Sequence, residues 1–194
     1  MVTDMADQLY LSYWLRNYSE QNMLKNYEKL LRLFPYSRLT QTPSTFRILA
    51  VNPTEPPVLE IPYPPPVKPE DVLAMSRDFQ NADACYRLET WWDLWQFTTD
   101  WELQPSRVAL CCFGPEFERE EGEHLQIEFG IDAHFLPQPS TENSLPMVQS
   151  NIKSLLKLVH DLDDGLPVET RRLWSESGEN FSEKLHLALA SNIQ

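Results

Sequence analysis

Hydrophobic side chains follow two kinds of spacing along this 194-residue chain, and the spacings predict both helices and strands. A spacing near 3.6 residues predicts helices over 19–34, 69–82, 148–162 and 181–189. Ser19 is a suitable N-cap for the first helix, and Pro35 ends it. Alternating or continuous apolar runs predict strands over 8–15, 46–51, 58–63, 85–97, 107–113 and 124–136.

The order of these elements is β-α-β-β-α-β, followed by two strands and two helices. It predicts an α+β fold with an antiparallel-rich mixed sheet, in which a ferredoxin-like β-α-β-β-α-β start is followed by a β-hairpin extension, with about four helices. We expect residues 8–194 to form a single α+β domain, because no change of composition divides them. Residues 1–7 are acidic and polar, and we expect them to form a flexible N-terminal tail.

The alternation within the later strands predicts which side chains share a face of the sheet. If 107–113 and 124–136 form a hairpin, Phe113 lies roughly opposite His124. One face then collects apolar side chains, namely Val108, Leu110, Cys112, Leu125, Ile127 and Phe129, with Tyr86, Leu88, Trp92 and Leu94 from an antiparallel 85–97. The sequence therefore predicts one fully apolar face, which forms the core.

The reverse of that sheet, called the mixed face below, combines large aromatic side chains with charged ones. Its expected members are Tyr10, Trp14, Arg87, Glu89, Trp91, Asp93, Trp95, Arg107, Cys111, Gln126, Glu128, Asp132 and His134. Three interpretations remain open: the C-terminal helices cover this face, it is a surface for self-association or a protein partner, or it binds a ligand. The candidate ligand or interface residues are Trp14, Trp91, Trp95, Arg107, Glu128, Asp132 and His134.

The charge balance narrows the possible partners. Sixteen basic against 29 acidic side chains give a formal net charge of −13, which disfavours nucleic-acid binding. The acidic excess is densest over 116–123 (EFEREEGE), which is typical of a solvated hairpin tip but could also bind a basic partner or, weakly, a cation. We find no signal peptide and no apolar run long enough to span a membrane, and only three cysteines, so we expect a cytoplasmic protein that does not bind membranes.

Familiar catalytic motifs are missing from the sequence. It contains no glycine-rich phosphate loop, no G-x-S-x-G elbow and no C-x-x-C or H-E-x-x-H zinc motif. Two weak constellations remain: Glu128, Asp132 and His134 on one strand face with Asp93 nearby as metal ligands, and a Cys111–His124 pair as an activated thiolate. A row of surface-polar side chains is the far commoner cause of the first pattern, and the second has no identifiable orienting group or oxyanion donor, so we expect no catalytic residue, metal or cofactor.

Together these observations predict a cytoplasmic, acidic, non-catalytic binding module that self-associates, or binds a protein partner, through its aromatic-rich mixed face. The alternative is a small-molecule-binding protein or hydrolytic enzyme that uses the same face. The proline-rich segment 53–69 is either a rigid connector or a docking segment for an aromatic groove.

Overall fold

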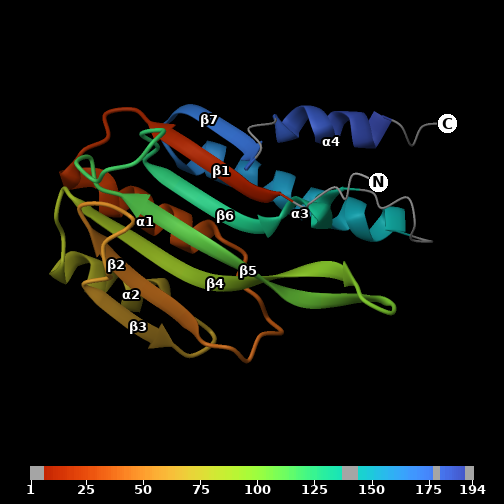
Figure 1. The fold of residues 1–194 in the computed structure, drawn as a ribbon, viewed down its shortest axis with the longest axis horizontal. Helices are drawn as coiled ribbons and strands as arrows, with labels where there is room; N and C mark the ends of the chain where they lie inside the picture. The colour runs from red at the N-terminus through yellow and green to blue at the C-terminus, as the bar shows by residue number, and fades with distance from the viewer. Residues whose placement is uncertain (1–6, 137–143, 177–179, 191–194) are drawn as a thin grey trace.

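The computed structural model describes residues 7–136, 144–176 and 180–190 (Figure 1). Residues 1–6 of the expected tail lie outside this part of the chain. Along the chain the elements are β1 (Gln8–Leu15), α1 (Glu20–Leu33), β2 (Ser44–Ala50), β3 (Leu59–Tyr63), α2 (Pro69–Asp78), β4 (Ala84–Phe97), β5 (Trp101–Phe113), β6 (Leu125–Ile131), the 3₁₀ helix η1 (Asp132–Phe135), α3 (Ser144–Gly165), β7 (Val168–Ser175) and α4 (Phe181–Ala190). The four α-helices and the α+β class agree with the sequence prediction.

The described strands form one seven-stranded sheet in the order β3-β2-β4-β5-β6-β1-β7, and every recorded pairing is antiparallel. The expected ferredoxin-like order is not confirmed. β2 lies between β3 and β4, and β1 lies at the other side of the sheet, between β6 and β7. Three strands therefore separate β1 from β2, although only α1 connects them along the chain.

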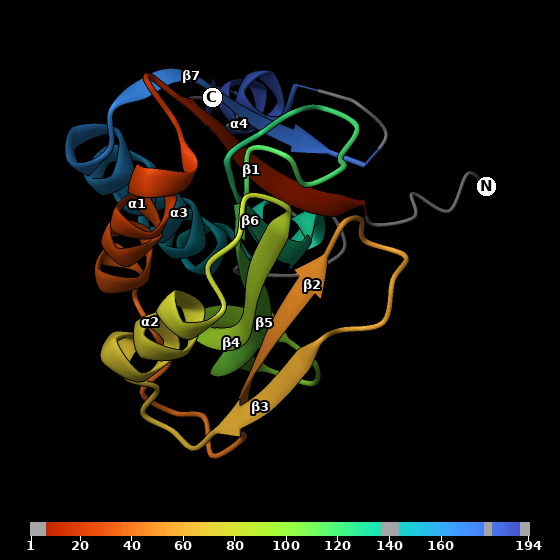
Figure 2. The same cartoon turned by 90° about the vertical axis from the view of Figure 1, so that its left-hand side faces the viewer.

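Helices α1, α2 and α3 pack against the same face of the sheet (Figure 2). That face carries the side chains that alternation placed there, and Tyr86, Leu88, Trp92, Leu110, Ile127 and Phe129 are all almost completely buried. The helices contribute an apolar stripe to the same core, which includes Met23, Tyr27 and Leu31 of α1 and Ile152, Leu155 and Leu162 of α3. The prediction of one apolar, core-forming face is confirmed.

The β4–β5 hairpin is longer than expected. β5 begins at Trp101, so the segment expected to connect two strands is itself paired, and Trp101 lies opposite Phe97. β2 pairs with β4 only as far as Glu89, and β6 pairs with β5 only from Ala109 onward. The two strands therefore continue past their neighbours as a two-stranded arm, residues 91–107, which projects from the sheet (Figure 1).

Two further boundaries differ from the sequence prediction. The strand expected over 124–136 ends at Ile131, because Gly130 has a positive φ of 77°, and the chain turns into η1. β7 was not predicted at all. Its polar run VETRRLWS lies along the edge of the sheet, where only Leu173 and Ser175 are buried, so the apolar signal of a strand is weak there.

Candidate binding face

The mixed face of the sheet is left uncovered by α1, α2 and α3 (Figure 2). Of the two C-terminal helices, α3 packs against α1 and β4 on the apolar face, and α4 lies beside the edge strand β7. The interpretation in which these helices cover the mixed face and bury its tryptophans is therefore wrong for α3. The tryptophan in the core is Trp92, whereas Trp91 and Trp95 alternate with it on the mixed face and are partly exposed.

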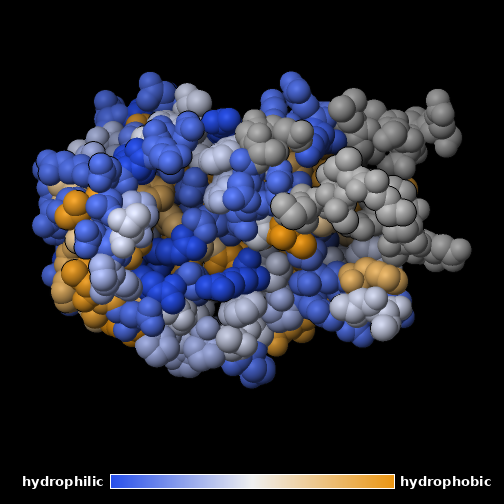
Figure 3. All heavy atoms as spheres, in the orientation of Figure 1, coloured by the Kyte–Doolittle hydropathy of each residue, from blue (hydrophilic) through white to orange (hydrophobic). Residues whose placement is uncertain are grey.

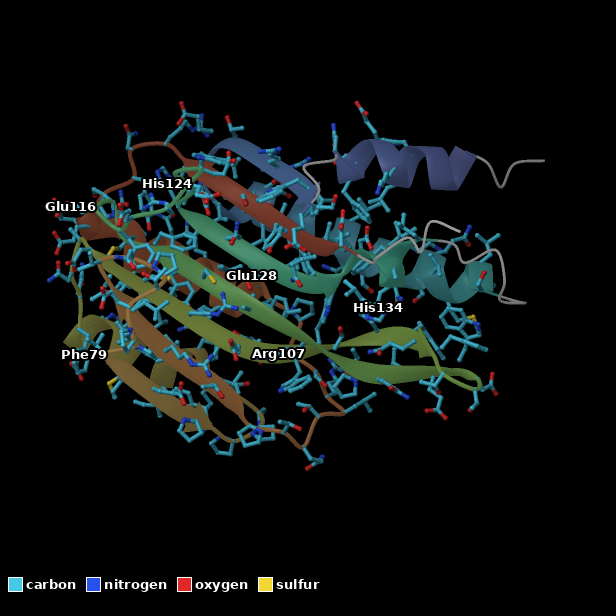
Figure 4. All side chains as sticks on the ribbon, viewed as in Figure 1. Phe79, Arg107, Glu116, His124, Glu128 and His134 are labelled. Carbon is cyan, nitrogen blue, oxygen red and sulfur yellow. The ribbon has the colours of Figure 1, made fainter. Side chains whose placement is uncertain are left out.

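A chain of ion pairs, called the ladder below, crosses five strands of this face. Its members are Glu60 of β3, Arg47 of β2, Arg87 and Glu89 of β4, Arg107 of β5 and Glu128 of β6. Arg87 forms a bidentate pair with Glu128, with Nη1–Oε1 and Nη2–Oε2 distances of 2.6 and 2.7 Å. Figure 4 shows Arg107 and Glu128 over the middle of the sheet.

Glu89 is the centre of the ladder. Its Oε1 lies 2.7 Å from Nη1 of Arg47 and 3.3 Å from Nε of Arg87, and its Oε2 accepts a hydrogen bond from Arg107. Burial raises the pKa of Glu89, but the three arginines outweigh this effect and the pKa is lowered overall. For Arg87, burial lowers the pKa, and the neighbouring Cys111 and Glu128 raise it by more. The ladder contains three arginines and three glutamates, so its formal charges balance.

Next to the ladder lies a hollow of about 760 Å³, bounded by β1, β7 and the loop 114–124. The stacked rings of Tyr10 and Trp174, with centroids 4.7 Å apart, line one side, and Phe113 and Phe117 line another. Cys85, Cys111, Arg87, Gln126 and Glu128 also contribute to its lining. In the space-filling view of this face, hydrophilic side chains gather over the middle, with apolar patches between them (Figure 3).

Hydrogen bonds on both flanks hold the loop 114–124, called the strap below, in place. The N–H groups of Glu116 and Glu118 donate to the carbonyls of Ala82 and Val51, both at 2.8 Å. On the other side, the N–H of His124 donates to the carbonyl of Tyr13 at 2.9 Å, and Nε1 of Trp14 donates to the carbonyl of Glu121 at 3.2 Å. The expected solvated tip is thus a strap tied to β1 and to the end of β2.

Two charged side chains of the strap are turned inward. Arg119 donates hydrogen bonds to backbone carbonyls of the strap, and Glu123 is buried. Arg119 donates to the carbonyls of Gly114, Phe117 and Gly122, and its guanidinium carbon lies 5.5 Å from the ring centroid of Phe113. Glu123 is only 7% exposed, and burial raises the pKa of its carboxyl group. Within the described part of the chain, Oε2 of Glu123 has no hydrogen-bond partner.

The structure brings only some of the candidate residues together. Arg107 and Glu128 belong to the ladder, Trp14 holds the strap, and Trp91 and Trp95 lie on the arm. Asp132 and His134 belong to η1 rather than to β6, and His134 lines a small cavity together with Trp95.

The row of metal ligands that the sequence allows as a weak alternative does not form. Oδ1 of Asp132 accepts the N–H of Asp7 at 3.2 Å, and Asp93 binds the hydroxyl of Ser37 and the N–H of Arg38. His134 lines a separate cavity of about 190 Å³ on the arm, and burial lowers its pKa. Among the described residues, no three His, Cys, Asp or Glu side chains converge in a way that could hold a metal ion.

The Cys111–His124 hypothesis is not supported. Burial raises the pKa of Cys111 to about 12, and its Sγ lies 3.4 Å from Nη1 of Arg87. His124 stacks on Tyr18 with centroids 4.0 Å apart, and its Nδ1 accepts the N–H of Leu15 at 2.8 Å. Burial lowers the pKa of His124 to about 4, so this imidazole is neutral and has a structural role.

Two features of the site were missed by sequence reasoning. Trp174 lies on β7, which was not predicted, so its stack with Tyr10 could not be foreseen. Arg47 and Glu60 extend the ladder from β2 and β3, and the sequence offered only their alternation as a signal.

The chain matches no family model, no curated protein and no solved structure. Within the described residues, no helix is both long enough and apolar enough to span a membrane. The function is therefore inferred from the geometry of the chain itself.

Proposed function

We propose that this protein is a non-catalytic binding module that self-associates through the mixed-face side of the arm. The observation that supports this proposal is the row of apolar side chains on that side. Trp91 and Trp95 are partly exposed. Leu103, which lies opposite Trp95, is 43% exposed, and Phe97 is 48% exposed. Aromatic side chains of this kind are typical of the centres of protein interfaces.

A second copy of the chain is a suitable partner for this row, because the charges within the row are balanced. The charged side chains at its alternating positions are Asp93 and Arg107, one of each sign, and Arg107 lies directly opposite Trp91. In a two-fold contact the same patch meets itself, and a patch with one acid and one base brings no net charge into the contact. The net charge of −13 opposes association least where the local charge is balanced.

The chemistry of the face favours binding over catalysis. The carboxylates of the ladder are ion-paired with arginines, which disfavours proton transfer by these groups. Burial raises the pKa of both Cys111 and Cys112 to about 12, so thiolates are disfavoured. All three cysteines are free and buried, which suits the reducing cytoplasm that we propose as the location.

Light scattering tests this proposal directly. We expect the wild-type chain to have twice the mass of one chain in solution, at both low and high salt, because the contact is apolar. In W91A/W95A the dimer should dissociate at least about 30-fold more readily, since the loss of even one central interface aromatic costs about 2 kcal/mol. Phe79→Ala, which removes an exposed aromatic side chain at the end of α2, is the matched control and should leave the dimer intact. A wild-type monomer at all concentrations would refute self-association.

The hollow supports a second candidate function, the binding of a small ligand or a peptide side chain. Its volume of about 760 Å³ lies within the range of ordinary ligand sites, and aromatic rings line it together with a few polar groups. This function can coexist with self-association, because the hollow lies beyond the ladder from the arm.

A further inference from the structure

The charge of the hollow is strongly one-sided. Five glutamates and two arginines line it, namely Glu118, Glu120, Glu121, Glu123, Glu128, Arg87 and Arg119. Arg87 is committed to Glu128 in the ladder, and Arg119 donates its hydrogen bonds to backbone carbonyls. Arg87 offsets Glu128, and the charge of Arg119 acts on Glu123, so five glutamates against two arginines leave the lining with a formal excess of three negative charges.

Among the described residues that do not line the hollow, one cationic side chain pairs with a carboxylate of the lining. Glu121 lies 3.6 Å from Nη1 of Arg172. Among the residues that the structure describes, Glu118 and Glu120 have no salt-bridge partner, and both are exposed on the strap. Because hydrogen bonds tie the backbone of the strap down at both ends, both glutamates remain at the rim of the hollow, which they help to line.

The buried carboxyl group of Glu123 points to a ligand independently of this charge count. Glu123 lines the hollow, its exposure is only 7%, and its Oε2 has no hydrogen-bond partner within the described residues. A buried carboxylate without a full set of partners is unfavourable, and a cation placed in the hollow would offset this unfavourable free energy. An anionic ligand would increase it.

The aromatic lining suits an organic cation. The protein already places guanidinium groups over two of these rings, because Arg172 lies 5.0 Å from the centroid of Trp174 and Arg119 lies 5.5 Å from that of Phe113. Aromatic faces attract ammonium and guanidinium groups, and apolar stems pack against their edges. A bare metal ion is a poorer match, because no described group of three acidic, His or Cys side chains converges there.

We infer that the hollow binds a guanidinium or primary ammonium group carried on an apolar stem. The stem lies against the Tyr10–Trp174 and Phe113–Phe117 walls, and the charged end approaches the carboxylates of the strap. This inference rests on the ligand-binding function proposed for the hollow and does not depend on the dimer contact of the arm. The same chemistry is available from a free amine or from an arginine or lysine side chain of a polypeptide.

Titration calorimetry with three probes tests the inference on the full chain. The probes are agmatine, the peptide acetyl-Gly-Arg-Gly-Arg-Gly-amide and its glutamate counterpart acetyl-Gly-Glu-Gly-Glu-Gly-amide. We expect the cationic probes to bind and the glutamate peptide not to bind. Binding should weaken as salt is raised from about 50 to about 500 mM, because the exposed charges are then screened. Tighter binding of the arginine peptide would identify a polypeptide as the source, and tighter binding of agmatine a free amine.

A matched pair of variants locates the binding. Replacing two glutamates of the strap in E118Q/E120Q should weaken cation binding about tenfold, because two nearby charges are lost. E169Q/E183Q changes the net charge equally at exposed positions on β7 and α4 and should keep affinity within about twofold. Both variants should keep the mass of the wild-type chain in light scattering, which separates this test from that of the arm. Equal effects of the two variants, or no cation binding at about 1 mM, would overturn the inference.

Discussion

The arm and the hollow lie on the same face of one sheet, yet they are built from different chemistry. The arm consists of two strands that extend beyond the strands on either side of them. It exposes Trp91, Trp95 and Leu103, and the charged side chains among them balance. The hollow is bounded by a strap that hydrogen bonds from two directions hold in place, and its lining is acidic. The ladder separates the two regions and is itself neutral.

This difference teaches that one uncovered sheet face can offer two kinds of contact. The apolar contact that we propose for the arm should depend on buried area and be insensitive to salt, whereas the ionic contact that we propose for the hollow should weaken as salt is added. Different hydrogen bonds also hold the two regions in place: those of Asn151 hold the arm, and those of the strap hold the hollow. The following variants should disturb one region or the ladder between them, and we give them from the largest expected effect to the smallest.

Asn151→Ala should disturb the arm alone. The side chain of Asn151 on α3 is buried, accepts the N–H of Trp95 at 2.9 Å, and donates to the carbonyls of Trp95 and His134 at 2.9 and 2.8 Å. Asn151 thereby satisfies the backbone N–H and carbonyl of Trp95, which have no neighbouring strand on that side of β4 within the described part of the chain. Loss of three hydrogen bonds should lower the free energy of unfolding by about 3 kcal/mol, measured by urea denaturation. Ser154→Ala, one turn further along α3, should change it by less than about 0.5 kcal/mol. Equal effects would contradict the role given to Asn151.

Glu128→Gln should weaken the ladder between the two regions. The variant leaves the partly buried guanidinium of Arg87 without its bidentate partner, and we expect a loss of about 2 kcal/mol in the free energy of unfolding. Glu60→Gln, at the 53%-exposed end of the ladder, should lose less than about 0.5 kcal/mol. Chemical denaturation of both variants at about 0.1 M salt measures the difference. A larger loss at Glu60 would mean that the Arg87–Glu128 pair is not the more stabilising part of the ladder.

Glu123→Gln should stabilise the region of the hollow slightly. Burial raises the folded-state pKa of Glu123 above its ordinary value, so the folded chain holds this proton more tightly than the unfolded chain. The contribution of Glu123 to stability therefore falls as pH rises from its ordinary pKa through its raised pKa. Glutamine removes this loss, and the melting temperature should rise by about 2 °C at neutral pH and remain unchanged at acid pH. Glu120→Gln, exposed on the same strap, should show no such difference between the two pH values.

Much of the local arrangement could be predicted from the sequence. The alternation along 85–97 and 107–113 predicted the buried row of Leu88, Trp92 and Leu110, and the hairpin pairing placed Phe113 beside His124, whose carbonyl accepts the N–H of Phe113 at 2.9 Å. The start of α1 was also predicted, where the side chain of Asn22 accepts the N–H of Ser19 at 3.0 Å. These features depend on residues close in sequence, or on strands joined by one turn.

The features that could not be predicted depend on distant parts of the chain. β1 pairs with β6 and β7, more than 100 residues away, and local patterns do not encode strand order. The prediction that Glu128, Asp132 and His134 share one strand face required an unbroken strand. The strand ends after Gly130, whose φ is positive, and the chain turns into η1. The wall of the hollow requires Tyr10 and Trp174 to meet, and this follows only from the pairing of β1 with β7.

The sequence by itself determined which side chains share a face, because successive side chains of an extended strand point to opposite sides of the sheet. Only the tertiary structure decided what covers each face. Helices α1, α2 and α3 all pack on the apolar side, where burial of their apolar stripes is most favourable, and they leave the mixed face uncovered. The strap and the edge strand β7 then enclose the hollow there, through hydrogen bonds between residues far apart in the chain.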